Sequence, residues 1–230
     1  MPSIEALHIL DNPNWHSLTT NHAHFALDTG LAKRYPTDIS LIVALAALNT
    51  AALRDLTGVV AKGEVVAVGG DDLPADAAGW TLQSHFSLIQ MVNDQPPVEV
   101  ETTETIVTLK TEDVPDILAL IDLTHPGPFL ARTIEMGHYI GVRKDGKLAA
   151  MAGERMYPPG YREISAVCTH PDYQGKGYAQ LLVSRLVAEN LRHGDVPFLH
   201  VSPTNTRALT LYERLGFRQR RELQLLIISY

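Results

Sequence analysis

Ala166-Val-Cys-Thr-His-Pro-Asp-Tyr-Gln-Gly-Lys-Gly-Tyr-Ala179 runs from an apolar strand through a glycine-containing loop into the first turn of a helix. Glycine lets the main chain approach a ligand closely, because it has no Cβ. The free N–H groups at a helix N-terminus, together with the aligned peptide dipoles, favour an anion. The stretch therefore predicts a site for a phosphate-bearing ligand.

Two other phosphate-binding loops do not fit these residues. A Walker loop needs Ser or Thr after its lysine, but Gly177 follows Lys176. A dinucleotide-binding fingerprint needs a third glycine where this chain has Gln180, within a run of βαβ units that is not found here. From the loop alone, the alternative to a phosphate site is a strand-to-helix turn in which the glycines only allow the backbone geometry.

A second segment strengthens the ligand interpretation. Residues 197–202, Pro-Phe-Leu-His-Val-Ser, indicate a buried strand. Residues 205–217 follow as Asn-Thr-Arg-Ala-Leu-Thr-Leu-Tyr-Glu-Arg-Leu-Gly-Phe. Apolar positions in this segment recur at helical spacing, which predicts a short amphipathic helix beside the strand.

Together the two segments resemble the GCN5-related N-acetyltransferase (GNAT) family. Residues 174–179 match its acyl-CoA loop, Gln-x-x-Gly-x-Ala. Residues 205–217 match Asn-x-x-Ala-x-x-x-Tyr-x-x-x-Gly-Phe, which in the family follows a strand that splays away from the CoA-binding strand. The resemblance covers roughly residues 98–230 and is strongest to the FR47-like branch. It implies a mixed α/β fold whose central, mostly antiparallel sheet is flanked by helices.

The composition is that of an ordinary globular protein. Of the 230 residues, 45% are hydrophobic and 20% charged. The formal net charge of −7, without a basic stripe, argues against nucleic-acid binding. A single cysteine, Cys168, excludes an internal disulfide and favours a reducing cytoplasm. The initial Met-Pro-Ser-Ile-Glu lacks the features of a secretion signal, and the apolar window at residues 39–53 is too short for a membrane span. We expect a cytoplasmic protein without a membrane partner.

A Pro-Pro pair within residues 93–97 predicts a boundary between residues 1–95 and 98–230. The first part is expected to be an extra α/β lobe, either a degenerate GNAT-like module that shapes the acceptor pocket or a packing module. The second part is expected to be the acetyl-CoA-binding domain. Three further helices are predicted: one over residues 37–56, one that begins after a cap at Thr111, and one that runs from the glycine loop to Gly194. The predicted strands cover residues 65–68, 84–92, 105–110, 139–143, 147–156, 163–169, 197–202 and 222–230.

The resemblance implies that acetyl-CoA or another acyl-CoA binds as co-substrate. Its pyrophosphate would contact the amides of Gln174, Gly175, Lys176, Gly177, Tyr178 and Ala179. Its pantetheine arm would bind like an added strand along Val167, Cys168 and Thr169. Asn205 would approach the same arm, and it also fits as the N-cap of the following helix. Lys176 and Arg207 either meet phosphates or are solvated charges.

Tyr212 is the candidate general acid. It shares a helix face with Ala208, Leu211 and Leu215, so it is expected to point inward. A phenol has an unperturbed pKa of about 10, so it is protonated at neutral pH and can donate to a departing thiolate. The alternative is a core tyrosine whose hydroxyl only finds a hydrogen-bond partner.

The base that accepts the amine proton is less well defined by the sequence. Glu163 lies near the start of the CoA-binding strand, where many GNAT enzymes place a carboxylate. Glu154, on the neighbouring strand, is a second candidate, and water is a third. Either glutamate also fits as an exposed strand residue or an ion-pair partner.

Two further groups of residues could supply a nucleophile or metal ligands. Cys168 and His170 share a strand face, so the imidazole could activate the thiol, although a buried cysteine is usually inert. His16, His22 and His24 lack the carboxylates or cysteines that would complete a metal site, and we expect no metal. The loop at residues 125–129 either borders the acceptor pocket or is an ordinary Pro/Gly connection.

These features predict an acyl-CoA-dependent N-acyltransferase that moves an acetyl group to a primary amine by direct attack. A backbone N–H along Val167, Cys168 and Thr169 would polarise the thioester carbonyl. The alternative is a non-catalytic acyl-CoA-binding regulatory module with the same fold, and a structural or dimerisation protein is a third option. Whether the acceptor is a small molecule or a peptide, and whether the last strand supports a homodimer, stays open.

Overall fold

The computed structural model describes residues 9–230. Its main element is an eight-stranded sheet in the order β4-β11-β5-β10-β9-β8-β7-β6. Its strands are β4 (Val65–Gly69), β5 (Thr81–Val92), β6 (Ile106–Leu109), β7 (Tyr139–Lys144), β8 (Lys147–Glu154), β9 (Tyr161–Thr169), β10 (Val196–Val201) and β11 (Arg218–Ser229). Only β9 and β10 pair in parallel, whereas the other neighbours are antiparallel. The mixed, mostly antiparallel α/β fold expected from the sequence is confirmed.

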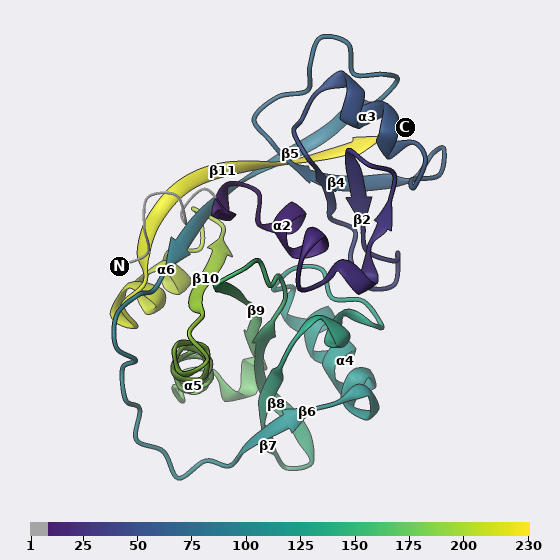
Figure 1. The fold of residues 1–230 in the computed structure, drawn as a ribbon. Coiled ribbons are helices and arrows are strands. Elements are labelled where there is room, and N and C mark those ends of the chain that lie inside the picture. Colours follow the sequence, from purple (N-terminus) through teal and green to yellow (C-terminus); the bar gives the residue numbers. More distant parts are fainter. Residues whose placement is uncertain (1–8) are drawn as a thin grey trace.

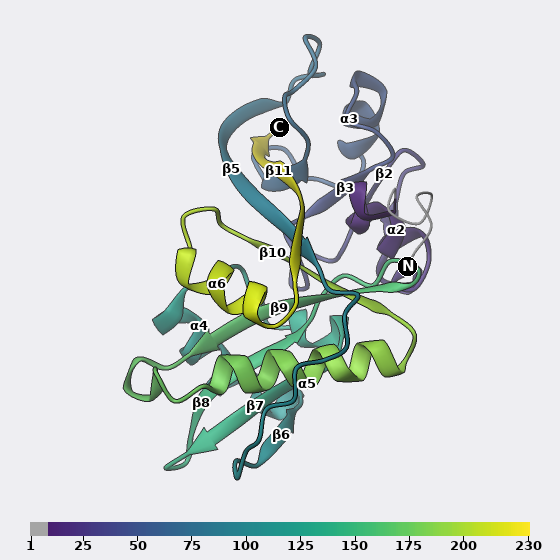
Figure 2. The same cartoon turned by 90° about the vertical axis from the view of Figure 1, so that its left-hand side faces the viewer.

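Helices cover both faces of the β6–β9 half of this sheet. They are α4 (Val114–Thr124) and α5 (Tyr178–Arg192), which pack on β8 and β9. A third helix, α6 (Thr206–Arg214), lies between β10 and β11 in the chain, and short 3-10 turns occur at η3 (Thr111–Asp113), η4 (Thr133–Met136) and η5 (Pro171–Tyr173). Figure 2 shows α5 in front of the sheet and α4 behind it. The apolar stripe predicted for α5 is confirmed, since Leu182, Val183 and Leu186 are fully buried. Gly194, at φ +85°, follows the last turn as expected.

The N-terminal residues form a smaller α/β lobe. It holds η1 (Ile9–Asp11), α2 (Pro13–Thr19), η2 (Ala23–Phe25), α3 (Thr50–Leu56) and a three-stranded sheet of β1 (Leu27–Asp28), β2 (Ala32–Arg34) and β3 (Val43–Leu45). In Figure 1 the long strands β5 and β11 arch from the main sheet up to this lobe. Its core packs Leu53 and Trp80 against Leu226 and Ile228 of β11. The division between residues 1–95 and 98–230 therefore crosses a shared sheet, and as a division into independent units it stays a prediction.

The predicted helix over residues 37–56 is wrong in its first part. Residues 43–45 instead form β3, in which Leu45 pairs with Ala32. The helix begins only at Thr50, where the side chain of Asn49 accepts the N–H of Ala52 at 2.9 Å. A continuous apolar run fits a buried strand as well as a buried helix, and here strand pairing decides between them.

The predicted cap at Thr111 is displaced by one residue. Lys110 caps η3, and the Asp113 carboxylate accepts the Lys110 N–H at 2.8 Å before α4 begins at Val114. The remaining predicted strands are confirmed to within a few residues, and β11 begins earlier than expected, at Arg218.

None of the helices within residues 9–230 has both the length and the apolar character needed to cross a membrane. The initial Met-Pro-Ser-Ile-Glu, from which the lack of a secretion signal was inferred, lies outside the described residues.

Candidate active site

The site is built where two parallel strands separate. Within the described chain, β9 and β10 pair from Tyr161↔Val196 to Glu163↔Phe198 and no further. β10 stays paired with β5 along its other edge from Phe198 to Val201, whereas the rest of the β9 edge that faces β10 has no strand partner among the described residues. A cleft of about 2080 Å³ opens there and extends to the N-terminal lobe. The splayed pair of strands predicted from the sequence is therefore present.

A β-bulge lies in the exposed part of β9. The register with β8 shifts between Met151↔Cys168 and Gly153↔Ser165. Ala166 within this bulge has φ +53°, a left-handed conformation that costs a non-glycine residue about 1–3 kcal/mol. Bulges of this kind free ladder groups and often lie beside active sites. Here the bulge is next to Val167, on the cleft wall.

The glycine loop has room for a phosphate group. Gly175 and Gly177 have φ of +77° and +79°, and a Cβ built on either one would meet no atom within 4 Å. Gly177 is also the N-cap of α5, so the free N–H groups of the first turn face the same open space. The loop therefore has the open main chain at a helix N-terminus that the sequence predicts for an anion site.

Side chains around the loop support this arrangement. Arg207 donates to Gln174 Oε1 at 3.2 Å, so a cation from α6 lies next to the loop. Lys176 lies over the ring of Tyr173, 4.8 Å from its centre. Tyr178 is buried, and its hydroxyl donates to Glu104 at 3.2 Å. Asn205 accepts the Ala208 N–H at 3.1 Å, which confirms its role as the helix cap.

Tyr212 points inward, as predicted. It is 8% exposed and packs edge-on against Phe217 with ring centres 5.8 Å apart. Burial, with a smaller contribution from Cys168, raises the pKa of its phenol to about 12. The phenol is therefore fully protonated at neutral pH and is available as a proton donor.

The structure brings nearly all the predicted site residues to one cleft. Tyr212 and the predicted cofactor-binding residues are all on its wall: Val167, Cys168, Thr169, Gln174, Gly175, Lys176, Gly177, Tyr178, Ala179, Asn205 and Arg207. Residues 125–128 of the α4–η4 loop line it too. The two candidate carboxylate bases are the exceptions, because neither Glu163 nor Glu154 is among the described residues that line the cleft.

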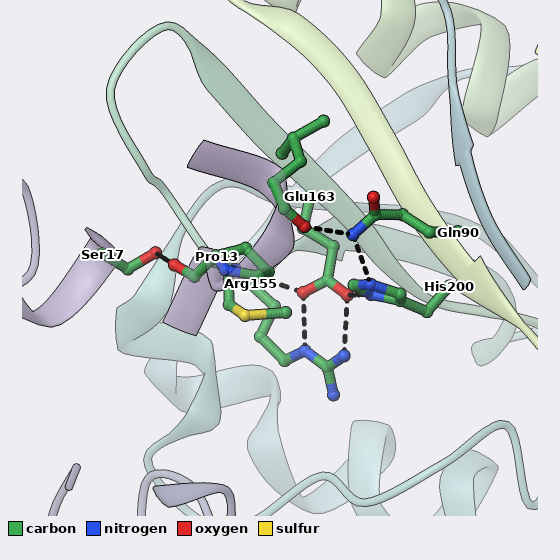
Figure 3. Close-up of polar contacts among 8 residues, drawn as sticks. Pro13, Ser17, Gln90, Arg155, Glu163 and His200 are labelled. Atoms are coloured by element: carbon green, nitrogen blue, oxygen red, sulfur yellow. Dashed lines mark hydrogen bonds and ion pairs between the residues drawn. The ribbon is translucent and has the colours of Figure 1, made fainter. Parts of the chain in front are cut away.

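Glu163 lies in a buried network behind the cleft wall (Figure 3). Its side chain has no exposed area, and Arg155 binds both of its oxygens, at 2.7 and 2.8 Å. His200 Nδ1 lies 2.8 Å from Oε1. Burial alone would raise the pKa of Glu163, but Arg155 and His200 outweigh it and lower the pKa to about 2. A carboxylate held this way is a weak proton acceptor, which favours a positioning role.

Glu154 is engaged in a similar way. Its Oε2 accepts from Arg162 at 3.0 Å and from the His138 N–H at 3.2 Å, and the residue is 2% exposed. Its ion pair with Arg162 is extended by Asp195, which also contacts Arg162 at 3.2 Å. Of the two candidate bases, neither presents an unpaired carboxylate to the cleft.

The covalent alternative finds no support in the geometry. Burial raises the pKa of the Cys168 thiol to about 11, so little thiolate forms at neutral pH. His170 Nδ1 accepts the Asp172 N–H at 3.2 Å, so this nitrogen is engaged within η5. A thiol in this setting behaves as a buried apolar side chain.

Two of the N-terminal histidines, His22 and His24, pack among aromatic rings. His22 Nδ1 is 2.9 Å from the Tyr35 hydroxyl, and the His22 ring meets His24 edge-on at 6.2 Å. Within residues 9–230 no three His, Cys, Asp or Glu side chains gather in a way that fits a metal ion. The expectation of a metal-free protein stays a prediction.

Sequence reasoning missed Arg155, Gln90 and His200. His200 is on the cleft wall, and Gln90 and Glu163 contact its two ring nitrogens. One signal was present in the sequence, since His200 is the only ionisable residue in the apolar strand at residues 197–202. The residues that contact the ring nitrogens of His200 lie on β5 and β9, far from it in the sequence, so these contacts are visible only in the folded structure.

Comparisons with known proteins agree with this geometry. The family model "FR47-like protein" matches residues 139–225. A crystal structure from the GNAT family, of a protein of Novosphingobium aromaticivorans, is 35% identical and has a TM-score of 0.86, with 96% of this chain and 97% of that chain covered.

Two curated relatives are more distant. An N-alpha-acetyltransferase RimI from Mycobacterium tuberculosis is 34% identical over 85 residues, which is 36% of this chain and 52% of the relative. The [ribosomal protein bS18]-alanine N-acetyltransferase of Escherichia coli is 28% identical over 121 residues, 50% of this chain and 81% of the relative. The chain thus spans about half the length of the first of these relatives. With a full-length match to a GNAT structure, an FR47-like segment, a splayed β9/β10 pair and the glycine loop at its end, the chain belongs to the GNAT family.

Proposed function

We propose that the protein is an N-acyltransferase that transfers an acetyl group from acetyl-CoA to a primary amine by direct attack. The observation that carries this proposal is the single cleft that joins the glycine loop, the free edge of β9 and the buried phenol of Tyr212. An acyl-CoA needs an anion site, an edge for its amide-containing arm and a proton donor near its sulfur. These three features lie along one continuous wall.

Different residues of the cleft would bind acetyl-CoA and transfer the proton. The loop amides and Arg207 would hold the phosphates, and the free edge of β9 would hydrogen-bond the pantetheine amides. A backbone N–H beside the bulge at Ala166 would polarise the thioester carbonyl. Tyr212, held protonated by burial, would give its proton to the sulfur as the carbon–sulfur bond breaks.

A peptide or protein amino terminus is the acceptor class we favour. The names of the Mycobacterium tuberculosis and Escherichia coli relatives describe N-alpha and ribosomal-protein alanine acetylation. The cleft also continues past the splayed strands to residues 39–43 of the N-terminal lobe and to β5, which leaves space for an extended acceptor. A cytoplasmic location, a homodimer and the lack of a nucleic-acid partner stay predictions.

The test is thiol release from acetyl-CoA in the presence of a panel of peptides with free or blocked amino termini. Thiol release with free termini alone, matched by acetylated peptide in mass spectra, supports the proposal. Tyr212→Phe should lower kcat by about 10²- to 10⁴-fold while the affinity for acetyl-CoA stays the same. Equal thiol release with blocked and free termini would contradict the acceptor class.

A non-catalytic acyl-CoA-binding module is the second candidate, and one observation favours it. Both predicted carboxylate bases are tied up in ion pairs with Arg155 and Arg162. If the protein only binds acyl-CoA, wild type and Tyr212→Phe should both bind it tightly. No amine should then raise thiol release above the uncatalysed rate.

A further inference from the structure

We propose that His200 is the base that takes a proton from the acceptor amine, with Glu163 as the positioning residue behind it and Gln90 as the partner of its second nitrogen. This inference rests on the proposed function above. It resolves the difficulty that the two candidate glutamates lie off the cleft. His200 and Arg155 both contact the Glu163 carboxylate and both line the cleft, and of these two only the imidazole can accept a proton.

Geometry fixes which nitrogen of His200 carries the proton. The Glu163 carboxylate is ionised and can only accept hydrogen bonds, so Nδ1, at 2.8 Å, must donate to it. In the neutral ring the lone pair is then on Nε2. A carboxylate that orients an imidazole in this way also stabilises the imidazolium that forms when Nε2 takes up a proton.

Gln90 fixes the same tautomer from the other side. Its Oε1 accepts from Arg220 at 2.8 Å, so its amide nitrogen is turned toward His200. That nitrogen donates to the Leu10 carbonyl at 2.9 Å and to His200 Nε2 at 3.1 Å. Uptake of a proton at Nε2 would place two N–H groups against each other. An acceptor amine would therefore have to take the place of the Gln90 N–H at Nε2 before the ring accepts its proton.

The charged and titratable groups around the ring come from several elements. Glu163 comes from β9, and Arg155 follows β8. Arg220 of β11 donates to Gln90 at 2.8 Å, and it pairs with Asp11 at 2.6 Å. Tyr35 and Tyr139 lie near Glu163, and burial raises the pKa of both phenols, so both are neutral. Among residues 9–230, Glu163 is thus the charged side chain that hydrogen-bonds His200.

The proton balance of the step is complete. An acceptor ammonium gives one proton to His200 Nε2, and the freed lone pair forms the carbon–nitrogen bond. When the carbon–sulfur bond breaks, its electron pair goes to sulfur, which takes the Tyr212 proton. The amide nitrogen then loses its second proton to the Tyr212 phenolate, and His200 releases its proton to water. The products are the amide, the free thiol and one proton, with no oxidant or reductant required.

The decisive test is the pH profile of kcat/KM in variants that act on His200 from opposite sides. In wild type kcat/KM should fall at low pH, which gives the profile an acidic limb, because only the neutral ring accepts a proton. Glu163→Gln removes the charge that favours the imidazolium, so the limb should move to lower pH by about one unit. Gln90→Met removes the donor that favours the neutral ring, so the limb should move to higher pH. A purely structural role would not produce opposite shifts.

Matched variants separate chemistry from folding. His200→Gln should lower kcat by about 10²- to 10⁴-fold and abolish the acidic limb, with acetyl-CoA affinity unchanged. His138→Gln is the control, because His138 faces Glu189 at 3.1 Å in a comparable pair that is not on the cleft wall. It should leave rate and profile unchanged. Glu163→Gln leaves Arg155 without its charge partner, so the double variant Arg155→Met/Glu163→Gln is measured beside it.

Imidazole NMR titration of the protein without substrates gives an independent readout. The His200 signals, assigned by their loss in His200→Gln, should show the Nδ1–H tautomer and the same opposite shifts in the two variants. If both variants shift the His200 signals in the same direction, the role of His200 is overturned while the proposed function stands. The same follows if His200→Gln keeps the wild-type rate and its fall at low pH. Absence of turnover in wild type with every amine overturns the proposed function and this role together.

Discussion

Replacing Arg155 with methionine should cost the protein about 3–5 kcal/mol of unfolding free energy at neutral pH. The change removes the two hydrogen bonds from Arg155 to Glu163, at 2.7 and 2.8 Å, and leaves a carboxylate with no exposed area without its guanidinium partner. Breaking a buried ion pair from one side usually costs that amount, because the remaining charge stays desolvated. The native pKa of Glu163, lowered from 4.5 to about 2, gives about 3 kcal/mol from linkage.

Urea unfolding followed by circular dichroism measures this cost, and its pH dependence identifies the cause. The lowered native pKa of Glu163 means that the wild type keeps this stabilisation above pH 4.5 and loses it as pH falls toward 2. In Arg155→Met the carboxylate can be protonated while buried, so the difference from wild type should shrink at pH 4. Arg185→Met is the control, because its Glu189 pair is more exposed and should contribute less than about 1 kcal/mol. An Arg155→Met loss no larger than this control would refute the reasoning.

Two further predictions concern stability. His22 is buried against Tyr35, and burial, with a smaller contribution from His24, lowers its pKa to about 4. As pH falls, His22 therefore takes up a proton near pH 6.5 in the unfolded chain but only near pH 4 in the folded chain. The free energy of unfolding should fall as pH is lowered across this window. His22→Gln should flatten that dependence in urea titrations, and an unchanged slope would contradict it. Leu186 is fully buried on the inward face of α5, so Leu186→Ala should cost about 2–5 kcal/mol, whereas Leu123→Ala at a 49% exposed position should cost less than about 0.5 kcal/mol. Equal melting temperatures for the two leucine variants would contradict the packing assigned to α5.

The sequence predicted the parts of the molecule that are local. The glycine loop, the stripe of α5, the Asn205 cap and the inward Tyr212 depend on residues within a turn or two of one another, and the structure confirms the geometry of each. The ligand roles given to these residues stay proposals. Local patterns failed at residues 43–45, where an apolar run became a strand because β2 was available to pair with it.

The polar network could not be predicted, because its members are far apart in the sequence. Gln90 and His200 are 110 residues apart, and Glu163 is 37 residues from His200. Their contacts follow from β10 lying between β5 and β9 in the sheet. The sequence therefore identified Glu163 as a candidate residue, but not Arg155 and His200, which contact its carboxylate and line the cleft.

Calorimetry of acetyl-CoA binding to wild type and to Gly177→Glu tests the central claim most directly. Gly177 lies on the cleft wall at φ +79°, and a glutamate there would put a bulky anion where the loop is expected to hold phosphates. Gly63→Glu is the matched control, because Gly63 has φ +84° and equally open surroundings but is not on the cleft wall. The account predicts micromolar binding in wild type and Gly63→Glu, and its loss in a folded Gly177→Glu variant. Absence of binding in folded wild type, or undiminished binding in Gly177→Glu, would contradict it.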